Sequence, residues 1–237
     1  MIREHFEYRE TITTILADDA DHITAAKEGM MTARSQLEEY LQADPFFGTS
    51  YSPVPANIDA PEIVRRMADA AANANVGPMA AVAASIAWAG VDAMQQAGAA
   101  FGLIDNGGDI ALISDRDIRV GLYAGSAPVS GKYAFRVPPQ NSILGICTSS
   151  ATVGPSVSFG IADAVVVFSK NPARADAWAT GICNVLCPEN EPFAALPLSA
   201  SEVCGVYAVI GDWTASWGPV PDLIPARVSQ DLITRGL

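Results

Sequence analysis

The stretch ILGICTSSATVGPSVSFGIADAVVVF, residues 143–168, is followed by NPARADAWAT at residues 171–180. Its two apolar ends are typical of buried strands, and the second motif is typical of a helix. Between the apolar ends lies a segment rich in Gly, Ser and Thr, and no charged residue occurs from Pro138 to Ala162. A surface loop of that length normally carries charges, so the segment is either buried or built around a ligand. Small and hydroxyl residues let backbone N–H groups approach an anion closely. The stretch therefore predicts a ligand pocket.

Composition narrows the class of protein. The chain has 237 residues, of which 50% are apolar and 17% are charged, so it can bury a substantial core and is not disordered as a whole. Its net charge of −12 disfavours a nucleic-acid surface, which needs clustered Lys and Arg. The same charge disfavours docking on anionic lipid.

The N-terminal sequence MIREHFEYRE is charged where a secretory signal would be apolar. The uncharged segment 70–91 contains Asn73, Asn75 and Pro78, so it is too polar and interrupted for a bilayer span and better suited to a buried helix. The chain has four cysteines, and without a secretory signal these are expected to be reduced thiols. We therefore expect a cytoplasmic protein.

Apolar periodicity gives an outline of the fold. In residues 21–42, for example, Ile23, Met30 and Leu37 keep helical spacing. Residues 5–16 are predicted as an opening strand or half of a hairpin, and 44–61 as a connecting loop. The other predicted helices span about 61–72, 79–97 and 173–186, and the other predicted strands lie within 99–105, 109–114, 117–123, 132–137, 142–147, 163–168 and 201–210. Helices before and between runs of strands indicate an α+β fold, with a mixed or antiparallel sheet covered by helices.

Two glycine-containing motifs allow both a structural and a functional interpretation. Asn106-Gly107-Gly108-Asp109 is a strong hairpin signal, but its backbone N–H groups and polar side chains can also contact a ligand. Gly77-Pro78-Met79 starts a helix, and the free N–H groups of a helix N-terminus favour an anion. In the hydroxyl-rich segment the expected ligand contacts are Thr148, Ser149, Ser150, Gly154, Ser156 and Ser158.

Asp176 and Thr180 lie four residues apart, so a helix presents them on one face. A carboxylate and a hydroxyl can hold Mg²⁺ through oxygen, with water and a substrate phosphate completing the shell. A structural role, with Asp as a cap and Thr bonded to its own helix, is the alternative.

The nucleophile candidates are few. Cys183 and Cys187 share the same spacing and are either structural or a thiol pair, whereas Cys147 borders the predicted pocket. The chain contains two histidines, His5 and His22, both far from the serine-rich segment in sequence. A Ser–His–Asp relay cannot be built from the residues of that segment.

Four segments occur in a characteristic order: VGPMAAVAASIA, DNGGDI, CTSSATVGPSVSFGIADAVVV and ADAWAT. In this order they resemble the UPF0280 family, a branch of the ApbE-like superfamily, over most of the chain. The resemblance implies a single ApbE-like, T-fold-related domain over residues 1–237. Within it, residues 1–60 would supply a strand, a helix and a connecting loop, and residues 61–237 the core with the pocket.

The better-known members of the superfamily are Mg²⁺-dependent transferases that cleave FAD and attach FMN to a Thr of a partner protein. The resemblance implies that Asp176 and Thr180 correspond to their metal-binding D-x-x-x-T motif, and Asn106–Asp109 to their GGD-type turn. It thus implies FAD or FMN and Mg²⁺ as cofactors, and an acceptor protein as a partner. The ligand would carry phosphate.

The chain departs from the transferase pattern in two places. It has Gly154-Pro155-Ser156 where the transferases place a His, and Asn75-Val76-Gly77 where they have an Ala-Lys-Gly-like run. Without that imidazole, Asp109 or Asp163 is the expected group for proton transfer.

Two alternatives to flavin transfer stay open. One is an accessory role in sulfur assimilation, to which this family has been linked in methanogens, with Cys147 as a pocket thiol. The other is a homodimeric binding protein without turnover.

Overall fold

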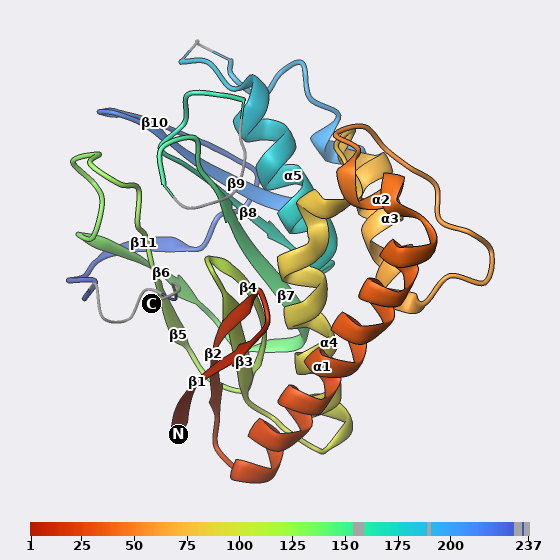
Figure 1. Cartoon of the computed structure of the whole chain (residues 1–237). Coiled ribbons are helices and arrows are strands. Elements are labelled where there is room, and N and C mark those ends of the chain that lie inside the picture. The colour runs from red at the N-terminus through yellow and green to blue at the C-terminus, as the bar shows by residue number, and fades with distance from the viewer. Residues whose placement is uncertain (154–158, 189–190, 230–233, 235–237) are drawn as a thin grey trace.

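The computed structural model describes residues 1–153, 159–188, 191–229 and 234, and its helices lie together on one side of a large sheet (Figure 1). The elements in chain order are β1 (Ile2–Tyr8), β2 (Thr11–Ala17), α1 (Ala20–Ala43), α2 (Pro45–Thr49), α3 (Glu62–Ala74), the 3₁₀ turn η1 (Pro78–Ala81), α4 (Val82–Gln96), β3 (Gly102–Asn106), β4 (Asp109–Ser114), β5 (Ile118–Gly121), β6 (Tyr133–Val137), β7 (Gln140–Ser149), β8 (Ala164–Ser169), α5 (Pro172–Val185), η2 (Leu198–Ala200), β9 (Val203–Ile210), β10 (Trp213–Trp217) and β11 (Asp222–Pro225).

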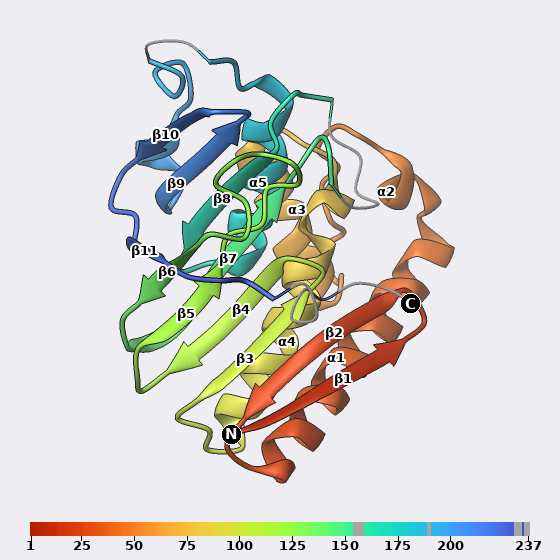
Figure 2. The same ribbon diagram turned by 90° about the vertical axis from the view of Figure 1, so that its left-hand side faces the viewer.

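The main sheet has eight strands in the order β1-β2-β3-β4-β7-β8-β9-β10, and all of its neighbouring strands are antiparallel. Figure 2 shows this sheet from the side away from the helices, with β1 and β10 at its two edges. A second sheet, β11-β6-β5, is also antiparallel. The expected α+β class and the antiparallel sheet are confirmed.

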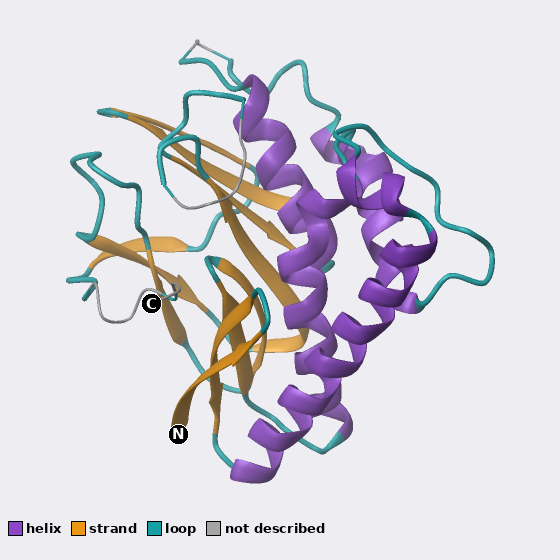
Figure 3. Ribbon diagram, viewed as in Figure 1, coloured by secondary structure: helices purple, strands orange, loops and turns teal. Residues whose placement is uncertain are grey.

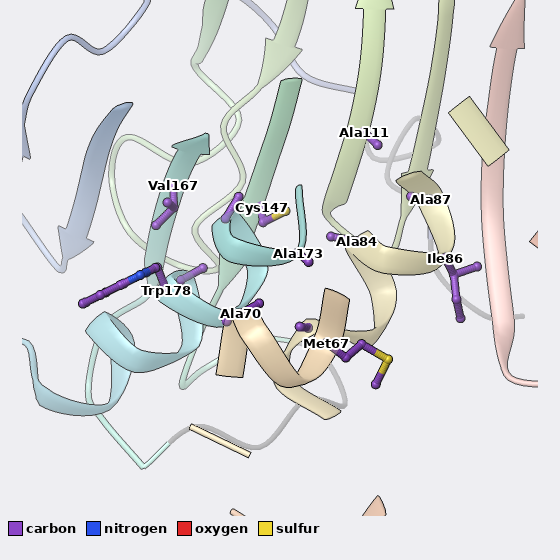
Figure 4. Close-up of a cluster of buried hydrophobic side chains, with 14 of the residues drawn as sticks. Met67, Ala70, Ala84, Ile86, Ala87, Ala111, Cys147, Val167, Ala173 and Trp178 are labelled. Atoms are coloured by element: carbon purple, nitrogen blue, oxygen red, sulfur yellow. The ribbon is translucent and has the colours of Figure 1, made fainter. Parts of the chain in front are cut away.

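Two apolar layers hold these elements together. The first lies between the helices and the main sheet. Figure 3 shows the helices in purple beside the strands in orange. Figure 4 shows part of this layer, which includes Met67 of α3, Ala84 of α4 and Trp178 of α5. The second layer lies between the two sheets, where the rings of Phe135 and Phe168 meet edge to face at 5.1 Å. The residues of the first layer set the position of the polar site described below.

The N-terminal prediction was incomplete. Residues 5–16 cover parts of both strands of the β1–β2 hairpin and the turn that joins them. The turn contains Arg9 with a positive φ of 56° and no Gly, Asn or Pro, so it lacks the usual turn signal. The following helix begins as expected, because the Asp19 carboxylate accepts a hydrogen bond from the Asp21 N–H at 2.9 Å.

The other boundaries need smaller corrections. The predicted loop 44–61 contains the short helix α2, and the predicted helix 79–97 begins as the 3₁₀ turn η1. Strands β10 and β11 were not expected. Helix α5 ends at Val185, so the exposed Cys187 lies beyond the helix that buries Cys183, and the two do not share a helix face. All four cysteines lie in the described residues, and no disulfide joins them.

Within the described residues, no single helix combines the length and apolarity needed to cross a membrane. The bent pair Glu62–Ala74 and Pro78–Gln96, with 106° between its halves, meets the criteria of length and composition when taken together.

Candidate functional site

The first turn of α4 is held on two sides by side chains from distant parts of the chain. Asp176 of α5 accepts a hydrogen bond from the Ala84 N–H to its Oδ2 at 3.0 Å. Asn106, at the end of β3, donates from Nδ2 to the Ala83 carbonyl at 3.0 Å. Two of the residues predicted for the site therefore meet at one helix N-terminus, where the helix dipole favours negative charge.

Asp109 and Cys147 approach the same place from the sheet. They are direct partners in the β4–β7 ladder, so their side chains project to the same face. Cys147 belongs to the apolar layer beneath the helices, as Figure 4 shows, so this face is the helical one. The Thr148 N–H donates to Asp109 Oδ1 at 3.3 Å. Asp109 is therefore aimed between the sheet and α5, toward Asp176.

Burial disfavours the ionised form of both carboxyl groups, and the nearness of Asp176 adds to this effect on Asp109. Burial, and then the nearby Asp176 charge, raise the pKa of Asp109 well above its usual range. Burial raises the pKa of Asp176 to about 7, although hydrogen bonds from the Ala84 and Ala83 N–H groups oppose the shift. No basic side chain contributes to either shift. This pair of acids needs either a proton or a cation.

The same environment acts on the thiol. Cys147 is fully buried, and its Sγ lies 3.7 Å from the Pro172 carbonyl. Burial, and then the charges of Asp109 and Asp176, raise the pKa of the Cys147 thiol well above its usual range. A thiolate is the nucleophilic form, so this environment disfavours reactivity at Cys147.

The residues around Asp176 suit a hard cation. Thr180 lies one turn further along α5 and is half-buried. Ser85, next to Ala84, is fully buried, and its Oγ has no hydrogen-bond partner among the described residues. Mg²⁺ takes oxygen ligands and is bound through one or two carboxylates plus water and phosphate. In the described part of the chain no cluster of three or more His, Cys, Asp or Glu side chains is arranged to hold a metal, so a cation here would need ligands from water or substrate.

The predicted turn Gly107-Gly108 is present and open. Both glycines have positive φ values, 68° and 104°, and a Cβ added at either would have no heavy atom within 4 Å. The Gly108 N–H donates to Asp105 Oδ1 at 2.8 Å, which closes the turn. The hairpin interpretation is correct, and the turn also leaves free space beside Asn106 and Asp109.

The described residues of the hydroxyl-rich segment form hydrogen bonds both within the segment and to Asp109 and Asp163. Ser149 is buried, and Thr148 uses its backbone N–H to contact Asp109. Ser150 Oγ accepts hydrogen bonds from the N–H groups of Thr152 at 3.0 Å and Val153 at 2.9 Å. Gly154, Ser156 and Ser158, predicted as ligand contacts, lie outside the described residues.

Asp163 lies apart from the acid pair and has a structural environment. Its Oδ1 accepts from the Thr152 hydroxyl at 2.9 Å, and its Oδ2 accepts from the Gly211 N–H at 2.7 Å. Both oxygens are therefore engaged in joining the hydroxyl-rich segment to the β9–β10 turn.

Gly77 fixes the approach to η1. A Cβ at this position would lie 1.9 Å from the Ser50 carbonyl oxygen and 2.9 Å from Tyr51 Cα. The glycine is thus required because another backbone segment passes directly over it. Pro78 starts η1 and is buried, and Met79 follows.

A cavity of about 280 Å³ opens beside this polar site. It shares Met79, Ala83 and Asn106 with the site, and its remaining lining is Glu10, Thr11, Arg34, Leu37, Glu38, Leu41, Val82 and Ile86. The walls are mainly apolar. Arg34 donates from Nε to Glu38 at 2.7 Å and is also paired with Glu10, so charged groups gather on one side.

The sequence did not reveal every component of the site. The contribution of α1 to the cavity was missed, because Leu37 and Arg34 fit an ordinary amphipathic helix. The Ala84 N–H was missed because a backbone donor has no residue signature. The four-residue spacing of Asp176 and Thr180 was the signal that singled out Asp176, although it did not point to the Ala84 N–H.

Comparison with known proteins places the chain in a family. The family model described as "AbpE bacteria" matches residues 2–195. The UPF0280 protein of Methanocorpusculum labreanum is 67% identical over 236 residues, with 100% of both chains covered. The UPF0280 protein of Methanoregula boonei is 56% identical over 237 residues, covering 100% of this chain and 99% of its own.

Solved structures show the same fold at low identity. The apo form of the flavinyl transferase ApbE from Pseudomonas stutzeri aligns with a TM-score of 0.58 at 12% identity, covering 100% of this chain and 98% of its own. The flavin transferase ApbE from Vibrio cholerae gives a TM-score of 0.59 at 12% identity, covering 91% and 96% of the two chains.

Proposed function

The chain belongs to the UPF0280 family and has an ApbE-like fold, and we propose that it binds a phosphate-bearing flavin with Mg²⁺ at the first turn of α4. We further propose that the bound nucleotide is FAD and that the reaction transfers FMN to a hydroxyl of an acceptor protein. The solved neighbours are flavin transferases, and their likeness to this chain supports the proposal at the level of fold.

The proposal rests on two buried carboxyl groups that lie close together, Asp176 at the N-terminus of α4 and Asp109 beside Asp176, with no basic side chain of the described residues acting on either. Two buried carboxyl groups in one site cannot both ionise cheaply unless a cation is present. Asp176 and Thr180 would hold the Mg²⁺ ion. When bound, the ion would neutralise the pyrophosphate and stabilise the charge that develops on the leaving phosphate.

The surroundings accommodate the rest of such a ligand. Asn106 joins the Gly107-Gly108 turn to the first turn of α4, and the space around the two glycines is open, so phosphates could approach here. The adjacent cavity of about 280 Å³ has apolar walls from Leu37, Met79 and Ile86. Ligand pockets usually measure roughly 300–1,000 Å³, so this cavity would receive one part of a dinucleotide and not the whole.

Proton transfer would fall to Asp109 in this proposal. Burial keeps the Asp109 carboxyl protonated in the absence of a cation; a bound cation would let it ionise, and the carboxylate could then accept the proton of an attacking hydroxyl. Asp163 is less suited, because both of its oxygens already accept hydrogen bonds. No observation favours the alternative role of a pocket thiol, since Cys147 is buried and its pKa is raised.

A thermal-shift assay with FAD, FMN and ADP, each with and without Mg²⁺, tests the ligand class. A ligand at a hundredfold excess over its dissociation constant stabilises the folded state by about 2.7 kcal/mol. We expect the largest shift with FAD and Mg²⁺ together. Equal stability in all six conditions would refute the proposal. Release of AMP on adding an acceptor then tests transfer separately from binding.

A further inference from the structure

The edge strand β10 has an unusual sequence for an exposed edge. Residues Trp213–Trp217 read WTASW and contain no charged side chain, in a molecule of net charge −12. Edge strands are normally guarded by charges or proline against pairing with another chain. The opposite edge, β1, follows that rule, since it contains Arg3, Glu4 and Glu7.

The hairpin geometry determines which backbone groups of β10 face outward. The turn Gly211-Asp212 closes on the pair Ile210–Trp213, and in a two-residue hairpin this closing pair is hydrogen-bonded. Backbone groups then alternate along the strand, so Trp213 directs its N–H and C=O to β9, and Thr214 and Ser216 direct theirs to the free edge. Figure 2 shows this edge at the end of the sheet.

The side chains of β10 also indicate that this edge is covered. Thr214 and Ser216 are exposed on one face. Trp213, Ala215 and Trp217 alternate with them and pack against the apolar layer beneath the helices, but each stays partly exposed. Large apolar side chains at the margin of a core, next to backbone groups that pair with no other described strand, indicate that something covers this edge.

The sequence of β10 is complementary to itself about Ala215. In an antiparallel pair centred on Ala215, Trp213 lies opposite Trp217 of the second strand, and Thr214 lies opposite Ser216. Cross-strand aromatic pairs and hydroxyl pairs both stabilise a ladder. Asp212 falls opposite Gly218, so the acidic residues of the two turns do not face one another.

We propose that β10 is a homodimer interface, in which two copies of this chain pair their β10 strands antiparallel about a two-fold axis at Ala215. The contact is isologous, so each copy supplies the same strand, and the two main sheets join into one. This inference concerns a surface outside the proposed flavin site and does not depend on the proposed activity.

A pair of double variants tests the register. Thr214→Lys/Ser216→Lys places lysine opposite lysine twice in the dimer, whereas Thr214→Lys/Ser216→Glu places lysine opposite glutamate twice. Both positions are exposed, so both variants should fold like the wild type. In sedimentation velocity over a dilution series, we expect the first variant to weaken dimerisation at least roughly tenfold relative to the second.

Cross-linking gives a second readout of the same register. Two residues at position 215 would form a non-hydrogen-bonded pair, with Cα atoms about 4.5 Å apart, which a disulfide can bridge. In a Cys187→Ser background, which removes the exposed native thiol, Ala215→Cys should form a disulfide-linked dimer on mild oxidation. Thr214→Cys is the matched control, because position 214 faces position 216 and should not cross-link.

Three results would overturn the proposal. The first is a wild-type chain that is monomeric across the dilution series. The second is equal dimerisation of the Lys/Lys and Lys/Glu variants. The third is cross-linking at position 214 as efficient as at position 215.

Discussion

The Asp176 carboxylate of α5 accepts a hydrogen bond from the Ala84 N–H at 3.0 Å, across 92 positions of the chain. This contact joins the C-terminal helix to the first turn of α4. Asp176 is only 7% exposed, so its charge is largely removed from water. The stability of the fold should therefore respond to the protonation state of this carboxyl group.

Asp176→Asn should change how stability depends on pH. The folded-state pKa of Asp176 is about 7 against an ordinary value of 3.8, so the folded protein holds this proton more tightly than the unfolded chain. The resulting stabilisation is fully present below about pH 4 and is lost as the pH rises through about 7. Without Mg²⁺, the wild type should therefore lose roughly 2–3 kcal/mol relative to the variant between pH 5 and pH 8. Urea unfolding at both pH values measures this difference, and parallel pH profiles would contradict the pKa assignment.

Gly77→Ala should destabilise the fold. Its Cβ would lie 1.9 Å from the Ser50 carbonyl oxygen, and backbone cannot move aside as a flexible side chain can. We expect a loss of about 2–3 kcal/mol in the free energy of unfolding. Gly48→Ala is the control, since its nearest contact is the end of the Leu41 side chain at 3.1 Å. Similar stability of the two variants would show that the loop after α2 does not pack over Gly77.

Asp163→Ala should affect stability and leave flavin binding intact. The substitution removes the acceptor of the Gly211 N–H at 2.7 Å and of the Thr152 hydroxyl at 2.9 Å. We expect a loss of about 1–2 kcal/mol in chemical denaturation. The control is Asp212→Ala, which lies next to Gly211 in the β9–β10 turn and should stay within about 0.5 kcal/mol of the wild type. If Asp163→Ala kept full stability but lost ligand binding or turnover, Asp163 would have to be assigned to the site.

Alkylation of the native protein should distinguish the cysteines. Cys187 is exposed and should react with iodoacetamide, whereas Cys147 is fully buried and its raised pKa disfavours the thiolate. Peptide mass spectrometry after a short exposure measures both residues in one sample. Labelling of Cys147 as fast as that of Cys187 would revive the pocket-thiol hypothesis.

Much of the fold could be predicted from local pattern. The spacing of Ile23, Met30 and Leu37 predicted α1, and Asp19 caps its first turn. The apolar runs before and after the hydroxyl-rich segment predicted β7 and β8. By contrast, the β1–β2 turn at Arg9 lacks a turn residue, and β10 is a short strand with no long apolar run. These elements exist because of their pairing with neighbours, which a local pattern does not contain.

Motif and spacing singled out Asn106, Asp109 and Asp176, but not how they are arranged. The structure brings Asn106 and Asp176 to the first turn of α4 and Asp109 close to Asp176, and their role in binding a ligand stays a prediction. Asp163 was selected as an acid near the hydroxyl-rich segment, but its hydrogen bonds direct it to the β9–β10 turn. Whether a carboxylate faces a helix N-terminus or a tight turn depends on tertiary packing, and the sequence around each Asp looks alike.

In the proposed function, Asp176 couples Mg²⁺ to flavin binding at the first turn of α4. This coupling can be measured by titrating FAD against the wild type and Asp176→Asn, each with and without Mg²⁺. We expect Mg²⁺ to tighten FAD binding to the wild type at least roughly tenfold, equivalent to about 1.4 kcal/mol, and to have little effect on the variant. An equal gain from Mg²⁺ in both proteins, or no FAD binding to the wild type in either condition, would contradict the claim.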